Sequence, residues 1–245
     1  MPSSQRSVII TGSSRGIGRA IAVKLGGEGY AVTVNYASGK GPAEEVVAEI
    51  VKNGGRAIAV QGDVSKAADV AKLFDETEKA FGKVDGLVNN AGVLAMKNVV
   101  ETSEADYDRM FDINVKGTFL TLKEAAKRLS DGGRIINFST SALHLKLPAY
   151  ATYCATKAAV EVYTQILAKE LKGRNITVNA VAPGPVATEL FFEGKSEELV
   201  KQLASLNPFN RLGEPDDIAN VVSFLLSPNA TWINGQTIRA NGGMA

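Results

Sequence analysis

Short apolar segments alternate with longer helical patterns along the whole chain, and this alternation is the feature that most restricts its fold. The segments have the length of strands, and their residues are nearly all apolar, as is typical of parallel strands covered on both faces. They span residues 7–11, 31–35, 56–60, 84–88, 134–139, 175–180 and 236–239. The sequence therefore predicts an α/β protein, a Rossmann-type doubly wound parallel sheet of about seven strands with helices on both faces.

The sequence contains no linker, repeat or low-complexity tract that would divide it. Since α/β chains of roughly 200–250 residues often form one unit, we expect residues 1–245 to be a single domain. Its least regular segment is 189–211. Its apolar side chains include Phe191, Phe192, Leu199, Leu203 and Phe209.

Composition excludes several classes of function. The 27 Lys and Arg residues balance 26 Asp and Glu residues, and a net charge of +1 gives no indication of a nucleic-acid or membrane partner. One cysteine, Cys154, and one histidine, His144, cannot form an internal disulfide or a usual zinc site, so no metal is expected. The N-terminal segment does not resemble a secretion signal, and no run approaches the roughly 18 apolar residues of a membrane span, which predicts a cytoplasmic protein.

A glycine-rich segment follows the first predicted strand directly, with the sequence Thr11-Gly12-Ser13-Ser14-Arg15-Gly16-Ile17-Gly18. A strand that turns sharply into a helix needs positions without Cβ, so that backbone N–H groups and the positive helix end can approach a pyrophosphate. The spacing differs from the common G-x-G-x-x-G pattern, and a plain glycine-rich turn is the alternative. We predict that the segment binds a dinucleotide through Gly12, Ser14, Arg15, Gly16, Ile17 and Gly18.

The end of the second predicted strand indicates which dinucleotide binds. An acidic residue there would accept hydrogen bonds from a free ribose 2′-hydroxyl and would repel a 2′-phosphate. The chain has no carboxylate at this place, where it reads Asn35-Tyr36-Ala37-Ser38, and we group these four residues with the cofactor contacts. Arg15, with Ser38 or Lys40, offers charge-assisted hydrogen bonds to a phosphate, although an exposed arginine is often only solvated. The sequence therefore predicts NADP(H) rather than NAD(H).

Tyr153 and Lys157 lie four residues apart at the start of a long helical pattern, so one helix face carries both side chains. In a chain with six tyrosines such a pair is nearly as expected by chance as by function, and its surroundings must decide. The hydroxyls of Ser139, Thr140 and Ser141 directly follow a predicted strand. They would therefore lie at the carboxyl edge of the sheet, where doubly wound folds bind ligands.

Two further polar groups point to the same edge. The motif Asn89-Asn90-Ala91-Gly92 ends the fourth predicted strand there. Asn114 interrupts an apolar helical stretch, and a buried polar side chain needs hydrogen-bond partners.

Together these motifs resemble the short-chain dehydrogenase/reductase family over essentially the whole chain. The glycine segment, the Asn89 to Gly92 motif, the Tyr153-x3-Lys157 pair and Pro183-Gly184 occur in the family's order and at its usual separations. The sequence is most similar to the trihydroxynaphthalene reductase-like and 3-oxoacyl-carrier-protein reductase groups. The resemblance implies an NADPH-dependent oxidoreductase that reduces a small-molecule carbonyl to an alcohol by hydride transfer. A 3-oxoacyl-[acyl-carrier-protein] reductase is the alternative, and a non-catalytic NADP(H)-sensing protein is a further one.

The resemblance also implies roles for single residues. Tyr153 would be the proton donor or acceptor, Lys157 its charge partner and a ribose ligand, and Asn114 a water-holding member of a proton relay. Other implied cofactor contacts are Asp63 and Val64 beside the adenine, then Asn90, Ala91, Gly92, Tyr153, Pro183, Gly184, Val186 and Thr188. A homotetramer is implied as well, through the helical segments 103–129 and 153–173 and the C-terminal segment. The single domain over 1–245 would thus both bind the dinucleotide and carry out catalysis. The apolar side chains of segment 189–211 predict a lid over the cofactor that determines substrate specificity, with a helix pair packed on the core as the alternative. The carbonyl substrate and the preferred direction of reaction stay open.

Two details of the site depend on local chemistry. Counting back from Tyr153 places the family's substrate-orienting serine on Thr140, but we slightly prefer Ser141, because the β-branched Thr140 has a stiffer χ1. A lysine ammonium about 4 Å from a phenol contributes on the order of 4 kcal/mol at an effective dielectric of 20. That energy lowers a phenol pKa from about 10 to about 7. We therefore expect Lys157, aided by an oxidised nicotinamide and opposed by desolvation, to lower the pKa of Tyr153.

Overall fold

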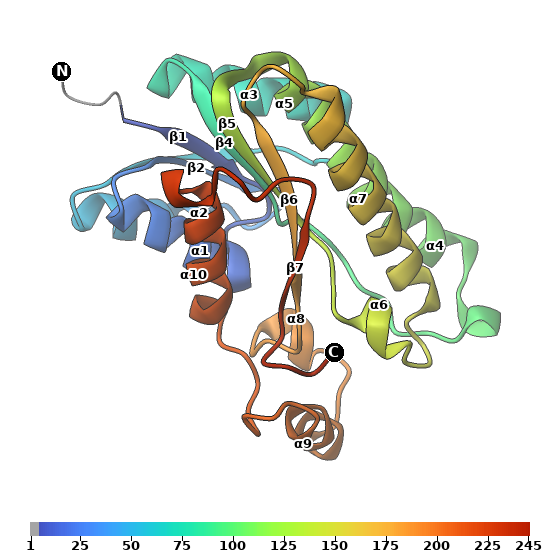
Figure 1. Ribbon diagram of the computed structural model, residues 1–245. Coiled ribbons are helices and arrows are strands. Elements are labelled where there is room, and N and C mark those ends of the chain that lie inside the picture. Colours follow the sequence, from blue (N-terminus) through green and yellow to red (C-terminus); the bar gives the residue numbers. More distant parts are fainter. Residues whose placement is uncertain (1–4) are drawn as a thin grey trace.

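The computed structural model describes residues 5–245, and its strands form one seven-stranded parallel sheet (Figure 1). The strands are β1 Ser7–Ile10, β2 Ala31–Tyr36, β3 Arg56–Gln61, β4 Val84–Asn89, β5 Leu129–Phe138, β6 Thr177–Pro183 and β7 Thr237–Ala240. Each of the seven predicted strands is present with its ends shifted by a few residues, which confirms the predicted α/β class. Residues 1–4, which belong to the segment of the secretion-signal prediction, lie outside the described residues.

The order of the strands creates a crevice at one edge of the sheet. The order is β3-β2-β1-β4-β5-β6-β7, so the chain moves outward from β1 to β3 and then returns to pair β4 with the other side of β1. The segments that follow β1 and β4 therefore lead away in opposite directions. Ligands of doubly wound folds bind at the carboxyl ends of the strands where this reversal occurs.

Helices cover both faces of the sheet, because successive strand residues point to opposite sides. Val8 and Ile10 of β1 pack with α1 Gly16–Gly27, α2 Lys40–Lys52 and α10 Pro215–Leu226. Ile9, between them, packs with α3 Ala67–Phe81 and α5 Gly117–Arg128, and Tyr163 and Leu167 of α7 Ala151–Glu170 pack on the same cluster. Figure 1 shows these two groups of helices on either side of the sheet. The apolar strands are thus buried on both faces, as their composition predicts.

The helical pattern over 103–129 is not one continuous helix. It consists of α4 Glu104–Met110, a π-helix (η2) over Phe111–Lys116, and α5. A π-helix is rare, and where it occurs it often marks a functional site. Asn114 is the buried residue of this π-helical turn, so the change of helical pitch sets the direction of its side chain.

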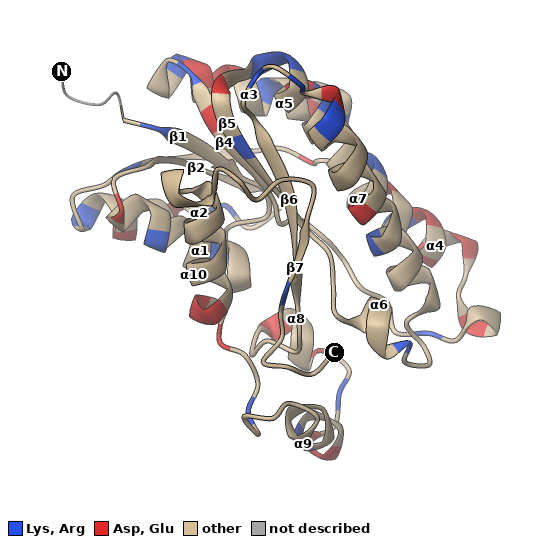
Figure 2. Ribbon diagram, viewed as in Figure 1, with Lys and Arg blue, Asp and Glu red and all other residues tan. Residues whose placement is uncertain are grey.

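The segments above the carboxyl ends of the strands are short. They are α6 Ala142–Leu145, α8 Glu189–Phe192, α9 Glu197–Ser205 and a 3₁₀ turn over Val99–Glu101. A second 3₁₀ turn, Pro228–Ala230, lies between α10 and β7. Charged residues of both signs are distributed mainly over the helices and loops (Figure 2). None of the helices within residues 5–245 is long and apolar enough to cross a membrane.

Candidate active site

The glycine segment makes a tight turn that only glycine allows at its key positions. Gly12 and Gly16 have φ angles of +60° and +56°, in the left-handed region that disfavours residues with a Cβ. A Cβ on Gly18 would lie 2.5 Å from Asn90 Nδ2 and 2.7 Å from Gly12 O. In the protein, Asn90 Nδ2 instead donates to Thr11 O and Gly12 O, each at 2.9 Å. The turns that follow β1 and β4 are thereby joined into one wall of the crevice.

The other predicted cofactor segment reaches the same wall. A Cβ on Gly16 would lie 3.6 Å from Thr188 Cγ2, so the turn after β6 approaches the start of α1. Thr188 begins α8 by accepting a hydrogen bond from Phe191 N. Arg15 is exposed and pairs with Glu189 across this gap, with 3.2 Å between Nη1 and Oε2. The structure thus brings the glycine segment, Asn90 and Thr188 together.

At the end of β2, two of the four predicted cofactor contacts are buried and two are exposed. Asn35 and Tyr36, which we grouped with the cofactor contacts, are buried. The Asn35 amide accepts from Gly12 N and donates to Gly62 O, at 3.2 and 3.0 Å, so it holds the glycine turn rather than facing outward. Ala37 and Ser38 are exposed. A buried amide must satisfy its own polar atoms, and here the neighbouring backbone satisfies them.

Two predicted adenine contacts also have internal partners. One carboxylate oxygen of Asp63 accepts from Ser65 N and Ser65 Oγ, at 3.0 and 2.7 Å. Val64 is buried against Gly117, where an added Cβ would lie 2.7 Å from Val64 Cγ2. Both residues lie next to the end of β3, where the Asp63 side chain is hydrogen-bonded to Ser65 and the Val64 side chain packs against Gly117.

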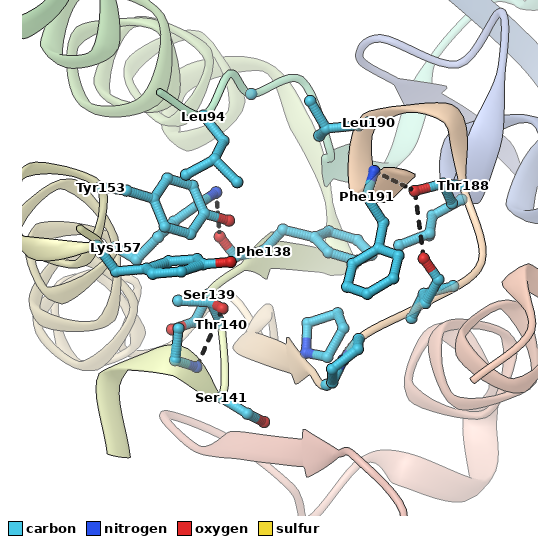
Figure 3. Close-up of a pocket in the computed structure, with 18 of the residues that line it drawn as sticks. Leu94, Phe138, Ser139, Thr140, Ser141, Tyr153, Lys157, Thr188, Leu190 and Phe191 are labelled. Carbon is cyan, nitrogen blue, oxygen red and sulfur yellow. Dashed lines mark hydrogen bonds between the residues drawn. The ribbon is translucent and has the colours of Figure 1, made fainter. Parts of the chain in front are cut away.

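Tyr153 and Lys157 extend from the first turns of α7 into one cavity of about 190 Å³ (Figure 3). Lys157 Nζ lies 5.8 Å from the centre of the Tyr153 ring and donates to Phe138 O at 2.8 Å. Phe138 is the last residue of β5, so the end of the sheet fixes the position of the ammonium. The predicted pair is therefore assembled, and the structure adds a backbone carbonyl that the sequence did not indicate.

Burial decides the protonation of both groups. Burial raises the pKa of the Tyr153 phenol above its ordinary value, and the nearby Thr140 side chain opposes that rise only in part. Burial also lowers the pKa of Lys157 from 10.5 to about 8. The protein alone therefore does not produce the lowered tyrosine pKa that we expected from Lys157. Desolvation of the phenolate outweighs the favourable groups around it, and the ammonium is itself desolvated.

The preference for Ser141 over Thr140 disagrees with the geometry. The Ser141 hydroxyl is buried, donates to Ala182 O at 3.0 Å and accepts from Asn241 Nδ2 at 2.9 Å. The Thr140 hydroxyl accepts from Ala142 N and lies beside the phenol, although that contact falls short of a well-formed hydrogen bond. Figure 3 shows Thr140 on the same side of the cavity as Tyr153. We preferred Ser141 because the χ1 of Thr140 is stiffer. In the folded protein, however, Ala182 and Asn241 already use the Ser141 hydroxyl, so Thr140 is the hydroxyl that faces the phenol.

Asn114 is fully buried and fixed by three hydrogen bonds. Its side chain accepts from Val93 N and donates to Val93 O and Thr156 Oγ1, at 2.8, 2.9 and 3.1 Å. A Cβ on Gly92 would lie 3.3 Å from Asn114 Oδ1 and 3.6 Å from Lys157 Nζ. The π-helix therefore places Asn114 behind the lysine, and Gly92 leaves the space between them open.

Much of the cavity wall comes from residues that the sequence did not single out. Leu94, Leu145, Leu147, Tyr150 and Lys195 line it together with Phe191 and Leu203 of the predicted lid. Phe192 and Phe209 are instead exposed, at 45% and 70%. His144 is exposed outside this lining. Loop residues follow no periodic pattern, so no sequence signal distinguishes those that face a cavity from those that face solvent.

Comparisons with known proteins agree with this geometry. A family model described as enoyl-(acyl carrier protein) reductase matches residues 12–245. The chain is 49% identical over 249 residues to a short-chain type dehydrogenase/reductase of Picea abies, covering 97% of this chain and 92% of that protein. It is 47% identical over 257 residues to an NADPH-dependent aldehyde reductase-like protein, chloroplastic, of Arabidopsis thaliana, covering 99% and 95%. The solved structure of the angucycline C-6 ketoreductase LanV with bound NADP is similar, with a TM-score of 0.92, 40% identity, and coverage of 98% and 95%.

Proposed function

Because the chain belongs to the short-chain dehydrogenase/reductase family, we propose that it is an NADP(H)-dependent oxidoreductase that reduces a small-molecule carbonyl to an alcohol. One observation carries the proposal. The Tyr153 phenol is buried at the end of an apolar cavity, beside the Thr140 hydroxyl and the Lys157 ammonium, where the carboxyl ends of the strands meet. A protonated phenol at this place is a proton donor for a carbonyl oxygen.

The crevice fits a phosphorylated dinucleotide. The left-handed turn at Gly12 and Gly16 and the contact that excludes a Cβ at Gly18 leave backbone exposed at the start of α1, where the helix end favours a phosphate. The absence of a carboxylate at the end of β2, with Arg15 exposed nearby, supports NADP(H) over NAD(H). The name of the Arabidopsis relative and the NADP bound to LanV support the same choice.

We assign the cofactor to specific groups of the chain. Gly12, Ser14, Arg15, Gly16, Ile17 and Gly18 would hold its phosphates, and Ala37, Ser38, Asp63 and Val64 would lie toward the adenosine half. The nicotinamide half would contact Asn90, Ala91, Gly92, Lys157, Pro183, Gly184, Val186 and Thr188. When bound, the nicotinamide supplies the hydride, and the protein supplies alignment and charge.

The protein's own groups then complete the reduction. Tyr153 Oη donates its proton to the substrate carbonyl oxygen, and the Thr140 hydroxyl holds that oxygen in place. Since burial raises the pKa of Tyr153, the phenol is protonated at neutral pH, as a reduction requires. Lys157 stabilises the phenolate that remains. Asn114 is assigned to a proton relay beside Lys157, and its hydrogen bonds to Val93 and Thr156 hold it in place there.

The proposal is tested by following NADPH and NADH consumption over a panel of ketones, quinones and 3-oxoacyl thioesters. We expect reduction of at least one carbonyl class, with NADPH preferred by about 10- to 100-fold, since a charge-assisted hydrogen bond contributes roughly 1.5–3 kcal/mol. Equal use of the two cofactors would contradict the role of Arg15. Activity confined to thioesters would favour the acyl-carrier-protein alternative, and inertness toward every carbonyl would favour an NADP(H) sensor.

The two candidate hydroxyls give a second test. Thr140→Val removes the hydroxyl beside Tyr153 with little change of shape, and we expect kcat/KM to fall by about 10- to 100-fold. Ser141→Ala is the matched variant one residue away, and we expect it to lower the melting temperature while kcat/KM of the folded enzyme stays within about threefold. The opposite ranking of the two activities, measured with NADPH under the same conditions, would restore our first preference for Ser141.

We also propose that the protein is a homotetramer and that it is located in the cytoplasm. We propose one domain over residues 1–245, in which 189–211 is the substrate loop. Exposed apolar side chains on α4, α5 and α7 support association of this face with other copies, as does Trp232, which is 99% exposed. The side chains on the helices are Tyr107, Phe119, Val162 and Ile166. The cytoplasmic location rests on the cysteine content, and the Arabidopsis relative is named as chloroplastic.

A further inference from the structure

A second lysine lines the cavity on the side of the lid. Lys195 lies between α8 and α9 and is half-buried. Its Nζ donates to Phe191 O at 2.7 Å and lies 4.8 Å from the centre of the Phe191 ring. Figure 3 shows Leu190 and Phe191 across the cavity from Tyr153 and Thr140. The cavity therefore has a proton donor at one end and an ammonium beside the opposite wall.

The Lys195 ammonium forms no ion pair with the described residues. Within residues 5–245, no carboxylate oxygen lies within 4.0 Å of Lys195 Nζ, and no Asp or Glu lines the cavity. An ammonium has three N–H donors, and the protein satisfies one of them with a conventional acceptor, Phe191 O. Burial lowers the pKa of Lys195, and the exposed carboxylate of Glu193 opposes this shift without forming an ion pair. A half-buried cation that forms no ion pair is stabilised by an anion that binds to it.

The remainder of the wall is apolar. Leu94, Leu145, Leu147 and Leu203 line the space together with Tyr150 and Phe191. Such a wall favours an aliphatic or aromatic body, and the polar groups fix its orientation. Lys157, the other cation of the lining, lies at the catalytic end beside the Tyr153 ring, where it is assigned to the phenolate and the cofactor ribose. Lys195 is thus the cation of the lining that has no role in the proposed reaction and can recognise charge on the substrate.

Resting on the proposed reductase function, we propose that Lys195 binds a carboxylate on the substrate, so that the preferred substrates are keto acids with an apolar or aromatic body. The carbonyl lies at Tyr153 and Thr140, and the carboxylate lies at the lid.

The test compares 4-acetylbenzoate with its methyl ester, which has the same ketone and ring without the charge. We expect the wild-type protein with NADPH to show about tenfold higher kcat/KM for the acid, mainly through a lower KM. Lys195→Met is expected to remove that preference, so that acid and ester have nearly equal kcat/KM. Lys195→Arg is expected to retain most of it. Lys201→Met, which removes an exposed lysine of α9, is the matched control and is expected to change neither substrate.

Calorimetry separates failure of this proposal from failure of the reductase function. The affinity of the NADPH-loaded protein for each benzoate is measured without turnover, and tighter binding of the acid that Lys195→Met abolishes supports the proposal even if neither ketone is reduced. Equal affinity for acid and ester in the wild-type protein overturns it. A raised KM for NADPH in Lys195→Met with an unchanged acid-to-ester ratio also overturns it, because the lysine would then bind the cofactor. Equal losses for both substrates would show that Lys195 only holds the lid.

Discussion

A Tyr153→Phe variant should lose carbonyl reduction by about 10²- to 10⁴-fold in kcat, the range that a positioned general acid contributes. The substitution removes one oxygen from a buried ring and leaves the contacts of the ring in place, so the protein should fold. The glycine segment is separate from the phenol hydroxyl, and NADPH affinity should stay within about twofold. Steady-state kinetics and a titration of NADPH fluorescence measure the two quantities.

The neighbouring tyrosine supplies the control. Tyr150 lines the same cavity, its ring centre lies 6.4 Å from that of Tyr153, and its hydroxyl contacts Met96 Sδ at 3.5 Å. Tyr150→Phe should therefore change kcat by less than about threefold, since a thioether sulfur is only a weak acceptor. If Tyr153→Phe retained near-normal turnover, Tyr153 would not be the proton donor. If both variants lost activity equally, the loss would reflect the shape of the cavity.

The second large effect concerns Lys157→Met. At roughly the 5.8 Å that separates Nζ from the ring centre, an ammonium stabilises a phenolate by about 3 kcal/mol at an effective dielectric of 20, which corresponds to about a hundredfold in rate. We therefore expect kcat to fall by about 10²-fold. Because Lys157 is also assigned to the cofactor ribose, NADPH binding should weaken in the same variant, in contrast to Tyr153→Phe.

The same substitution should change stability in a way that depends on pH. Since the pKa of Lys157 falls from 10.5 to about 8 on folding, the unfolded chain binds more protons between these values, and stability rises with pH in that window. Below pH 8 the buried charge costs on the order of 3 kcal/mol. The variant removes this cost but leaves Phe138 O without its donor, which costs about 1–3 kcal/mol.

These opposing effects predict a change of sign. At pH 7 Lys157→Met should be more stable than the wild-type protein by on the order of 1 kcal/mol, and near pH 10.5 it should be less stable by about 1–2 kcal/mol. Denaturant unfolding at both pH values measures the difference. A variant that is less stable at pH 7 and shows no dependence on pH would mean that Lys157 is not desolvated in the folded protein.

The sequence predicted the parts of this protein that depend on local patterns. Apolar runs bounded by turns located the seven strands, and their lack of alternation predicted a sheet buried on both faces. The spacing of four residues placed Tyr153 and Lys157 on one face of α7, and the structure puts both in one cavity. The role of the glycine segment as a tight turn was also predictable, because Gly12 and Gly16 adopt a left-handed backbone conformation that other residues avoid.

Only the tertiary structure decided how these groups are used. The side chain of Asn35, predicted as a cofactor contact, holds the glycine turn, and the Ser141 hydroxyl is hydrogen-bonded to Ala182 and to Asn241 from the C-terminal segment. The tyrosine pKa rises rather than falls, because it depends on how much of the whole chain covers the phenol. Periodicity and turn chemistry act between residues close in sequence. Burial, hydrogen-bond partners and desolvation come from segments far apart in sequence, and no local pattern records them.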